Sequence, residues 1–152
     1  MGAISNLLNR VIEYNNGLTS GEYIKHAIEE NEAFIVELNS EDQLYEKGIT
    51  STGVSIADYA PYSETTVEIK LQKGQPVNRV TLRDEGDFHM SFYLEIMEEE
   101  FEIRANDWKI KDLTRYYGDE IMGLTDENIM VVAREFVYPE LLETAKKVIL
   151  ND

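Results

Sequence analysis

The chain has 152 residues, of which 43% are hydrophobic, 10% aromatic and 29% charged. This composition is typical of one folded domain, residues 1–152, that is long enough to bury a core. The absence of cysteine excludes disulfides and thiolate metal ligands. No apolar run approaches the ~18 residues that a membrane span requires, so no membrane contact is expected.

The formal net charge is −16, from 30 acidic and 14 basic residues. Such a chain repels the phosphate backbone, so specific nucleic-acid binding is not expected. The simplest interpretation of the charge is solubility. Two others stay open, namely docking onto a basic partner and mimicry of nucleic acid at a basic groove.

The first third of the chain predicts helices. Apolar residues from Ile4 to Ile12 recur at helical spacing, and Asn15-Asn16-Gly17 is expected to end this helix, so that residues 1–18 form a helical arm. Thr19-Ser20-Gly21-Glu22 has capping-box spacing and predicts a second helix. The apolar run 34–38 favours helix because no turn signal precedes it.

A second capping box, Ser40–Gln43, predicts another helix that ends at Gly48. Residues 49–62 are expected to form a surface loop with a short strand around Val54 and Ile56. Ser63 then predicts the N-terminal cap of a helix that carries an apolar side and ends before Gly74.

From Phe88 to Ile96 apolar and polar residues alternate, which predicts a half-buried strand. The alternation resumes from Phe101 to Ala105 after the acidic turn at 98–100. The pair predicts an antiparallel hairpin with one apolar face.

Asp107 predicts a capped helix through 108–117, ending at Gly118, in which Trp108 and Tyr116-Tyr117 are interpreted as core residues. Thr125 opens the longest helical pattern, residues 125–152, and Pro139 predicts a kink within it. The expected fold is α+β, with an antiparallel hairpin or small curled sheet packed by several helices and a long kinked C-terminal helix.

Few residue types for catalysis are present, since His26 and His89 are the only histidines. Asp84, Asp87 and His89 form the one compact cluster that resembles a metal site, but a divalent site usually needs further ligands. We interpret the cluster as an exposed strand face beside a turn with Gly86. No catalytic residue, cofactor site or metal ligand is predicted, so the chain is not expected to be an enzyme.

A sequence pattern runs through residues 43–130. It begins with Tyr45-x-x-Gly48 and continues with Tyr-x-Pro-Tyr-Ser-x-x-Thr at 59–66 and two lysines, Lys70 and Lys73. It ends with Thr-Leu-x-x-x-Gly-Asp-Phe-x-x-Ser-Phe at 81–92 and Gly-Leu-Thr at 123–125. This order resembles the small virion-morphogenesis proteins of tailed bacteriophages, the tail-completion and head–tail joining group.

The resemblance implies a structural protein without enzymatic activity or cofactor, built into the virion in the bacterial cytoplasm as a ring beneath the portal or at the top of the tail. Its partners would be copies of itself and neighbouring portal, connector or tail proteins. We expect contacts through the terminal helices, through Tyr59 and Tyr62 in the 49–62 loop, and through Arg79 and Arg83 unless these form local ion pairs. A negative wall would also suit a conduit along which DNA slides.

Two alternatives remain. An acidic inhibitor or nucleic-acid mimic would bind a basic host protein in a salt-sensitive manner. A small enzyme would depend on Asp84, Asp87 or His89.

Overall fold

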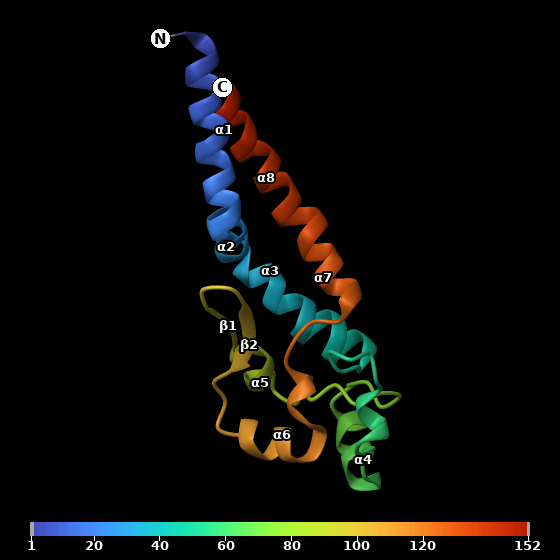
Figure 1. The fold of residues 1–152 in the computed structure, drawn as a ribbon. Helices are drawn as coiled ribbons and strands as arrows, with labels where there is room; N and C mark the ends of the chain where they lie inside the picture. The colour runs from blue at the N-terminus through green and yellow to red at the C-terminus, as the bar shows by residue number, and fades with distance from the viewer. Residues whose placement is uncertain (1, 152) are drawn as a thin grey trace. The chain divides into compact units, whose positions relative to one another are not determined.

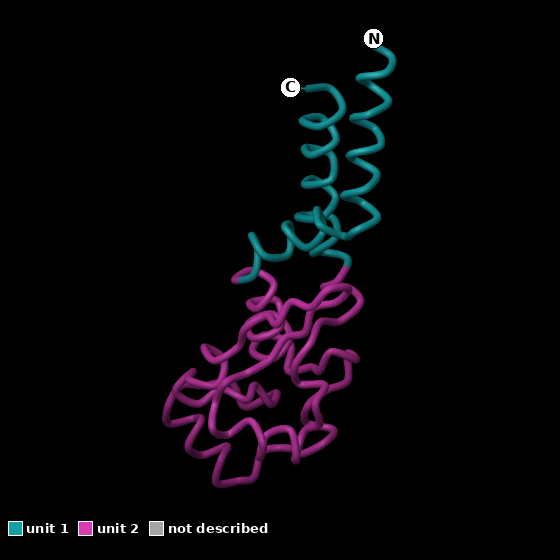
Figure 2. Tube along the Cα trace, turned by 60° about the vertical axis from the view of Figure 1, so that its left-hand side comes forward, with its two compact units in different colours: residues 1–32, 130–152 teal, residues 33–129 magenta. Residues whose placement is uncertain are grey.

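The computed structural model describes residues 2–151, which form helices and one two-stranded antiparallel sheet (Figure 1). The predicted α+β class is confirmed. The chain divides into two compact units (Figure 2). The helical unit comprises residues 1–32 and 130–152, and the central unit comprises residues 33–129. Among residues 2–151, no helix combines the length and the apolar character needed to cross a bilayer.

The helical unit is built on a long helix from each end of the chain. Helix α1 (Ala3–Ser20) lies antiparallel to the C-terminal helix, with its first turns beside η5 (Lys146–Leu150) (Figures 1 and 2). The Tyr14 hydroxyl donates a hydrogen bond of 3.0 Å to the carbonyl of Leu141. Arg10 Nη1 lies 3.5 Å from the carbonyl of Ile149. These two bonds fix the register of the pair.

The predicted end of the first helix at Asn15-Asn16-Gly17 is wrong. Helix α1 runs on to Ser20 and stops at Gly21, whose φ of 74° breaks the helix. Gly17 is buried, and a Cβ placed there would overlap the ring of Tyr23. The glycine therefore serves the close approach of α2 (Glu22–Glu30) rather than a turn.

The capping box predicted for α2 does not form, although the helix does. Its N-cap is Gly21, which has no side chain to accept a hydrogen bond. Ser20 Oγ instead accepts a long bond of 3.4 Å from the Glu22 N–H. The rings of Tyr14 and Tyr23 stack with their centroids 5.5 Å apart, which joins α1 to α2.

The C-terminal helix is long and kinked, as predicted. Helical structure continues through α7 (Asp126–Val132), η4 (Ala133–Val137), α8 (Tyr138–Ala145) and η5. Segments η4 and η5 are π-helical. Pro139 lies at the start of α8 and has no N–H, so the turn before it loses a standard hydrogen bond at the place where the helix widens.

The central unit begins with α3 (Glu32–Glu37), which confirms helix over 34–38. The π-helical segment η1 (Leu38–Lys47) continues it and ends at Gly48, as predicted, with φ of 63°. The second capping box is wrong, because Ser40 lies within the helix and its hydroxyl donates to the carbonyl of Val36 at 3.2 Å. The following loop contains one bridge, Ile49 with Ser55, and the 3₁₀ turn η2 (Ile56–Asp58).

Ser63 caps α4 (Glu64–Gln72) as predicted, and its Oγ accepts a bond of 3.2 Å from the Thr66 N–H. The buried side of this helix differs from the apolar side that the sequence suggests. Ile69 and Leu71 are 47% and 60% exposed, whereas Lys70 is only 7% exposed.

The predicted hairpin is confirmed over β1 (Phe92–Ile96) and β2 (Phe101–Ala105), with Leu94 opposite Ile103. The strand predicted over residues 88–91 is wrong, because Asp87–Met90 forms the helical turn α5. Gly86 adopts φ of 99°, and its carbonyl accepts a bond of 3.0 Å from the Met90 N–H. The chain therefore turns before it extends.

After the hairpin comes helix α6 (Ile110–Tyr117), which ends at Gly118 as predicted. It begins two residues later than predicted, and its N-cap is Lys109, not Asp107. Asp107 Oδ1 instead accepts a bond of 2.7 Å from the Lys109 N–H in the turn before the helix. The 3₁₀ turn η3 (Asp119–Ile121) comes next. The core role expected for the aromatic residues is wrong for two of the three, since Trp108 is 81% and Tyr116 68% exposed. Only Tyr117 is half-buried.

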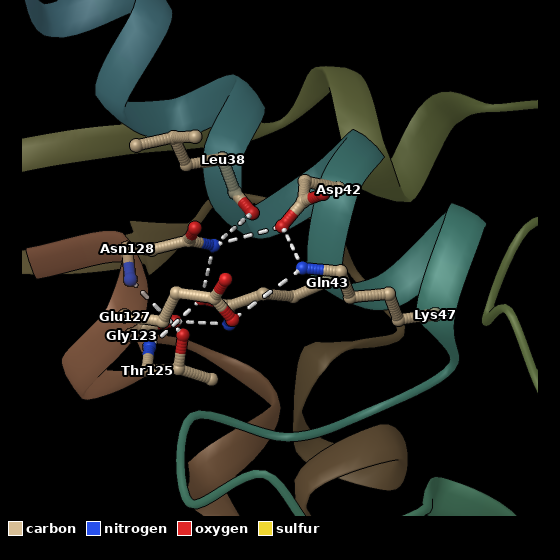
Figure 3. Close-up of polar contacts among 8 residues, drawn as sticks. All are labelled: Leu38, Asp42, Gln43, Lys47, Gly123, Thr125, Glu127 and Asn128. Carbon is tan, nitrogen blue, oxygen red and sulfur yellow. Dashed lines mark hydrogen bonds and ion pairs between the residues drawn. The ribbon is translucent and has the colours of Figure 1, made fainter. Parts of the chain in front are cut away.

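A buried network of amide side chains joins the first helices of the central unit to its last residues, 121–128 (Figure 3). Gln43, on η1, is fully buried, and its Nε2 donates to the carbonyl of Gly123 at 2.9 Å. Its Oε1 accepts from the Thr125 N–H at 2.8 Å and from Asn128 Nδ2 at 2.9 Å. Asn39 adds a bond from its Nδ2 to the carbonyl of Ile121 at 3.1 Å. These amides join segments that lie 80 or more residues apart in the sequence.

We expect Gln43→Ala to lower the free energy of unfolding by about 3 kcal/mol, because the Gly123 carbonyl and the Thr125 N–H lose their partner and Asn128 Nδ2 loses one of its three acceptors. Chemical denaturation measures this change. Gln72→Ala is the control, since Gln72 is an exposed glutamine at the end of α4. Equal small effects of both substitutions would show that the network does not hold the unit together.

Candidate functional site

The first half of α1 carries a row of exposed apolar side chains. Ile4 is 84% and Leu8 57% exposed, and neither is covered by the rest of the chain. At 100° per residue these side chains fall on one side of the helix, next to the side that bonds to the C-terminal helix through Arg10 and Tyr14. The α1 apolar strip consists of Ile4, Leu7, Leu8, Val11 and Ile12.

The C-terminal helix adds exposed apolar surface of its own. Tyr138 and Leu142 lie one turn apart and are 62% and 46% exposed, and Leu150 is 63% exposed. Among residues 2–32 and 130–151, only Gly17, Ala27, Ile28 and Val132 are buried. The helical unit therefore holds more apolar surface than it covers.

Two segments of the helical unit carry no net charge. Helix α1 has one cation, Arg10, and one anion, Glu13, and the segment 138–150 has two of each. The chain as a whole carries −16. The α1 apolar strip thus lies where electrostatic repulsion between two copies is weak.

A second group of candidate residues lies in the central unit, around the segment 80–83. The Tyr62 hydroxyl accepts a bond of 2.9 Å from the Thr81 N–H, and the His89 ring nitrogen Nε2 lies 2.9 Å from the Thr81 carbonyl. Lys70 Nζ donates to the carbonyl of Arg83 at 2.6 Å. These bonds hold a segment in which Leu82 adopts φ of 54°, an unfavourable value for leucine.

The segment 80–83 borders a cavity of about 330 Å³. Two of the predicted contact residues, Tyr62 and Arg83, line it, and Tyr59 and Arg79 do not. Tyr59 is a 47% exposed surface residue. The full lining is Tyr62, Thr66, Ile69, Lys70, Lys73, Leu82, Arg83, Asp84, Glu85, Gly86, Asp87, Phe88, Lys109, Leu113 and Tyr117.

Both predicted arginines form local ion pairs. Arg83 Nη1 lies 3.1 Å from Glu41 Oε2, and Arg79 Nη2 lies 4.0 Å from Glu46 Oε2. The two guanidinium groups also lie near the ring of Tyr45, at 4.6 Å and 5.8 Å from its centroid. Both arginines therefore already have an acidic partner within the chain.

The structure does not bring Asp84, Asp87 and His89 together as metal ligands. The Asp84 carboxylate bonds to Lys73, and this hydrogen bond lowers the pKa of Asp84 and raises that of Lys73. His89 turns away into the interior. Within residues 2–151, no group of three or more His, Asp or Glu side chains is arranged to hold a metal ion.

Comparison with known proteins yields no match, whether with family models, curated proteins or solved structures.

Two residues of the cavity, Lys109 and Tyr117, were not predicted as site residues. Both come from the α6 region, whereas Tyr62 and Lys70 precede or belong to α4. Local patterns give no signal for a cavity that forms only when distant segments pack. The sequence places Trp108 next to Lys109, but the helical spacing of this tryptophan favours a core position. The structure shows that it is exposed.

His89 gives a pH-dependent prediction. A carbonyl can only accept, so Nε2 must carry the proton that bonds to Thr81, and Nδ1 has no partner among residues 2–151. Burial lowers the pKa of His89 below its ordinary value of 6.5. The neutral ring is therefore the stable form in the folded protein.

The stability that depends on neutral His89 is complete above the unfolded-state pKa and is lost as the pH falls through 6.5 towards the lower folded-state pKa. We expect the free energy of unfolding to fall by up to about 1.4 kcal/mol per pH unit in that window from this residue. Denaturation from pH 7.5 to pH 5 should show the fall in the native protein and in His26→Gln, whose histidine is exposed, and not in His89→Gln. The same fall in all three would contradict the assignment.

Proposed function

We propose that the chain is a structural protein of a tailed-phage virion, at the head–tail junction, and that it works by contacts with copies of itself and with adjoining proteins of the particle. The α1 apolar strip is the observation that carries this proposal. A helix with five exposed large apolar residues, on a unit that buries few residues, is suited to be completed by another chain. The choice of a tailed-phage particle rests on the order of motifs in residues 43–130, which resembles that of the tail-completion and head–tail joining proteins.

The distribution of charge supports a copy of the same chain as one partner. A patch without net charge can meet its own counterpart without repulsion, whereas the acidic remainder of one chain would repel that of the next. Asn15 and Asn16 of α1 can each donate and accept hydrogen bonds at the rim of such a contact. Head-to-tail repetition of such a contact closes into a ring when the rotation permits it.

The energy of this contact is modest. Fully burying a Leu or Ile side chain is worth about 1.5–3 kcal/mol, so covering the exposed half of five on each of two copies gives on the order of 10 kcal/mol. Association costs about 4–15 kcal/mol. The strip alone therefore supports weak, concentration-dependent association, and stable assembly requires further partners, as expected for a protein that is ordered within a particle.

Solution mass and particle content test the proposal together. We expect the purified chain to increase in average mass between 5 and 500 µM, and Leu8→Glu to remain monomeric at concentrations at least ten-fold higher. Asn9→Glu adds the same charge to α1 outside the strip and should associate like the native chain. Sedimentation equilibrium measures all three.

Quantitative mass spectrometry of purified particles, from a phage whose genome encodes the chain, should find it in a fixed ring-like copy number. Particles without the chain would contradict the virion assignment even if the chain associates in solution. A monomeric chain that binds a basic host protein tightly and loses that binding in high salt would favour the acidic-inhibitor alternative, which rests on the net charge of −16.

A further inference from the structure

Lys70 is a buried cation with neutral partners. Its side chain is 7% exposed, and its Nζ donates to the carbonyl of Arg83 at 2.6 Å and to Gln75 Oε1 at 3.0 Å. It also lies 5.0 Å from the centroid of the Tyr62 ring. No carboxylate within residues 2–151 forms an ion pair with it. Asp84 attracts Lys70 electrostatically, but its carboxylate is hydrogen-bonded to Lys73 and forms no ion pair with Lys70. A buried ammonium without a direct ion pair is costly.

Two further donors line the same cavity, and unlike Lys70 they have no hydrogen-bond acceptor among residues 2–151. Lys109 contacts the ring of Trp108, 5.5 Å from its centroid, and has no carboxylate partner in the described part of the chain. The Tyr117 hydroxyl likewise has no hydrogen-bond partner there, and burial raises the pKa of this phenol, so it keeps its proton. Lys70, Lys109 and Tyr117 all line the cavity of about 330 Å³.

The rest of the lining defines the kind of ligand that would fit. Ile69, Leu82, Phe88 and Leu113 supply apolar walls. The volume lies at the lower end of the range of about 300–1,000 Å³ that is usual for small-molecule sites. A ligand with an apolar body and a polar head would use both parts of the lining.

The charges around the cavity favour a head group with a single negative charge. The lining carries four positive charges, from Lys70, Lys73, Arg83 and Lys109, and three negative ones, from Asp84, Glu85 and Asp87. Glu41, which pairs with Arg83 from outside the lining, brings the balance to zero, so that Lys70 and Lys109 are the cations without an ion pair. Lys73 and Arg83 are already paired with acidic residues. A dianion such as a phosphate monoester would therefore be repelled by the acidic side of the rim.

We propose that this cavity binds a small monocarboxylate with an apolar or aromatic body, whose carboxylate accepts hydrogen bonds from Lys70, Lys109 and Tyr117. This binding site is separate from the assembly function proposed above and does not depend on it.

The test uses 4-phenylbutyrate as the probe and 4-phenylbutanol as its uncharged counterpart, with the full-length protein. Isothermal titration calorimetry at low salt measures both dissociation constants, and the fluorescence of Trp108, the single tryptophan, reports binding beside Lys109. We expect the carboxylate to bind at least ten-fold more tightly than the alcohol and than phenyl phosphate. Equal binding of acid and alcohol, or tighter binding of the phosphate, would overturn the proposal.

Variants locate the binding. Lys109→Met and Tyr117→Phe should each weaken binding of 4-phenylbutyrate at least three-fold, while Lys111→Met, which removes an exposed lysine outside the cavity on the same helix, should not. These positions are not fully buried, so the variants are expected to fold, and circular dichroism confirms that they do. An unchanged dissociation constant in the first two, or an equal loss in Lys111→Met, would place the carboxylate elsewhere and refute the site.

Discussion

The helical unit cannot bury its own apolar surface, and this constraint governs the account of the molecule. Two long helices in one layer, with α2 across them, leave few positions that are enclosed on every side. Only four described residues of this unit are buried, while Ile4, at the start of α1, is 84% exposed. Surface of this kind is stable in water only at low concentration or beneath another chain. The absence of net charge on α1 and on the segment 138–150 weakens the electrostatic repulsion that would oppose such a cover.

The central unit is built differently, because polar groups hold it as much as apolar ones. Gln43 and Asn128 are almost completely buried and bond to the backbone or to one another. Tyr62 and His89 do the same for the segment 80–83. Several residues of the sequence pattern in 43–130, such as Gln43, Tyr62 and His89, therefore act within the fold, where they hold the segment 80–83 and the network around Gln43.

Local signals were reliable where chemistry within a few residues decides the structure. Ser63, Gly48 and Gly118 mark helix ends as predicted, and alternation predicts both strands of the hairpin. The failures have a common cause in tertiary packing. Gly17 was taken for a stop, although it makes room for the Tyr23 ring, and Phe88 continues an alternating pattern although Gly86 turns the chain into a helix.

The candidate sites show the same division. The apolar strip of α1 and the scarcity of its charges are visible in the sequence, and the structure shows these side chains exposed. The contacts proposed for them stay a prediction. Arg79 and Arg83 were recognised as scarce cations with local pairing expected, and both pair locally. The cavity could not be predicted, because Lys70 and Lys109 come from separate helical segments and meet only after folding.

Hydrogen exchange of the α1 amides, measured as a function of protein concentration, tests most directly whether the apolar strip is covered by another copy. The account predicts that amides within residues 3–20 exchange several-fold more slowly at 500 µM than at 5 µM, while exchange in β1 and β2 of the central unit stays unchanged. Exchange of α1 that is independent of concentration, in the free protein and in the assembled particle alike, would contradict it.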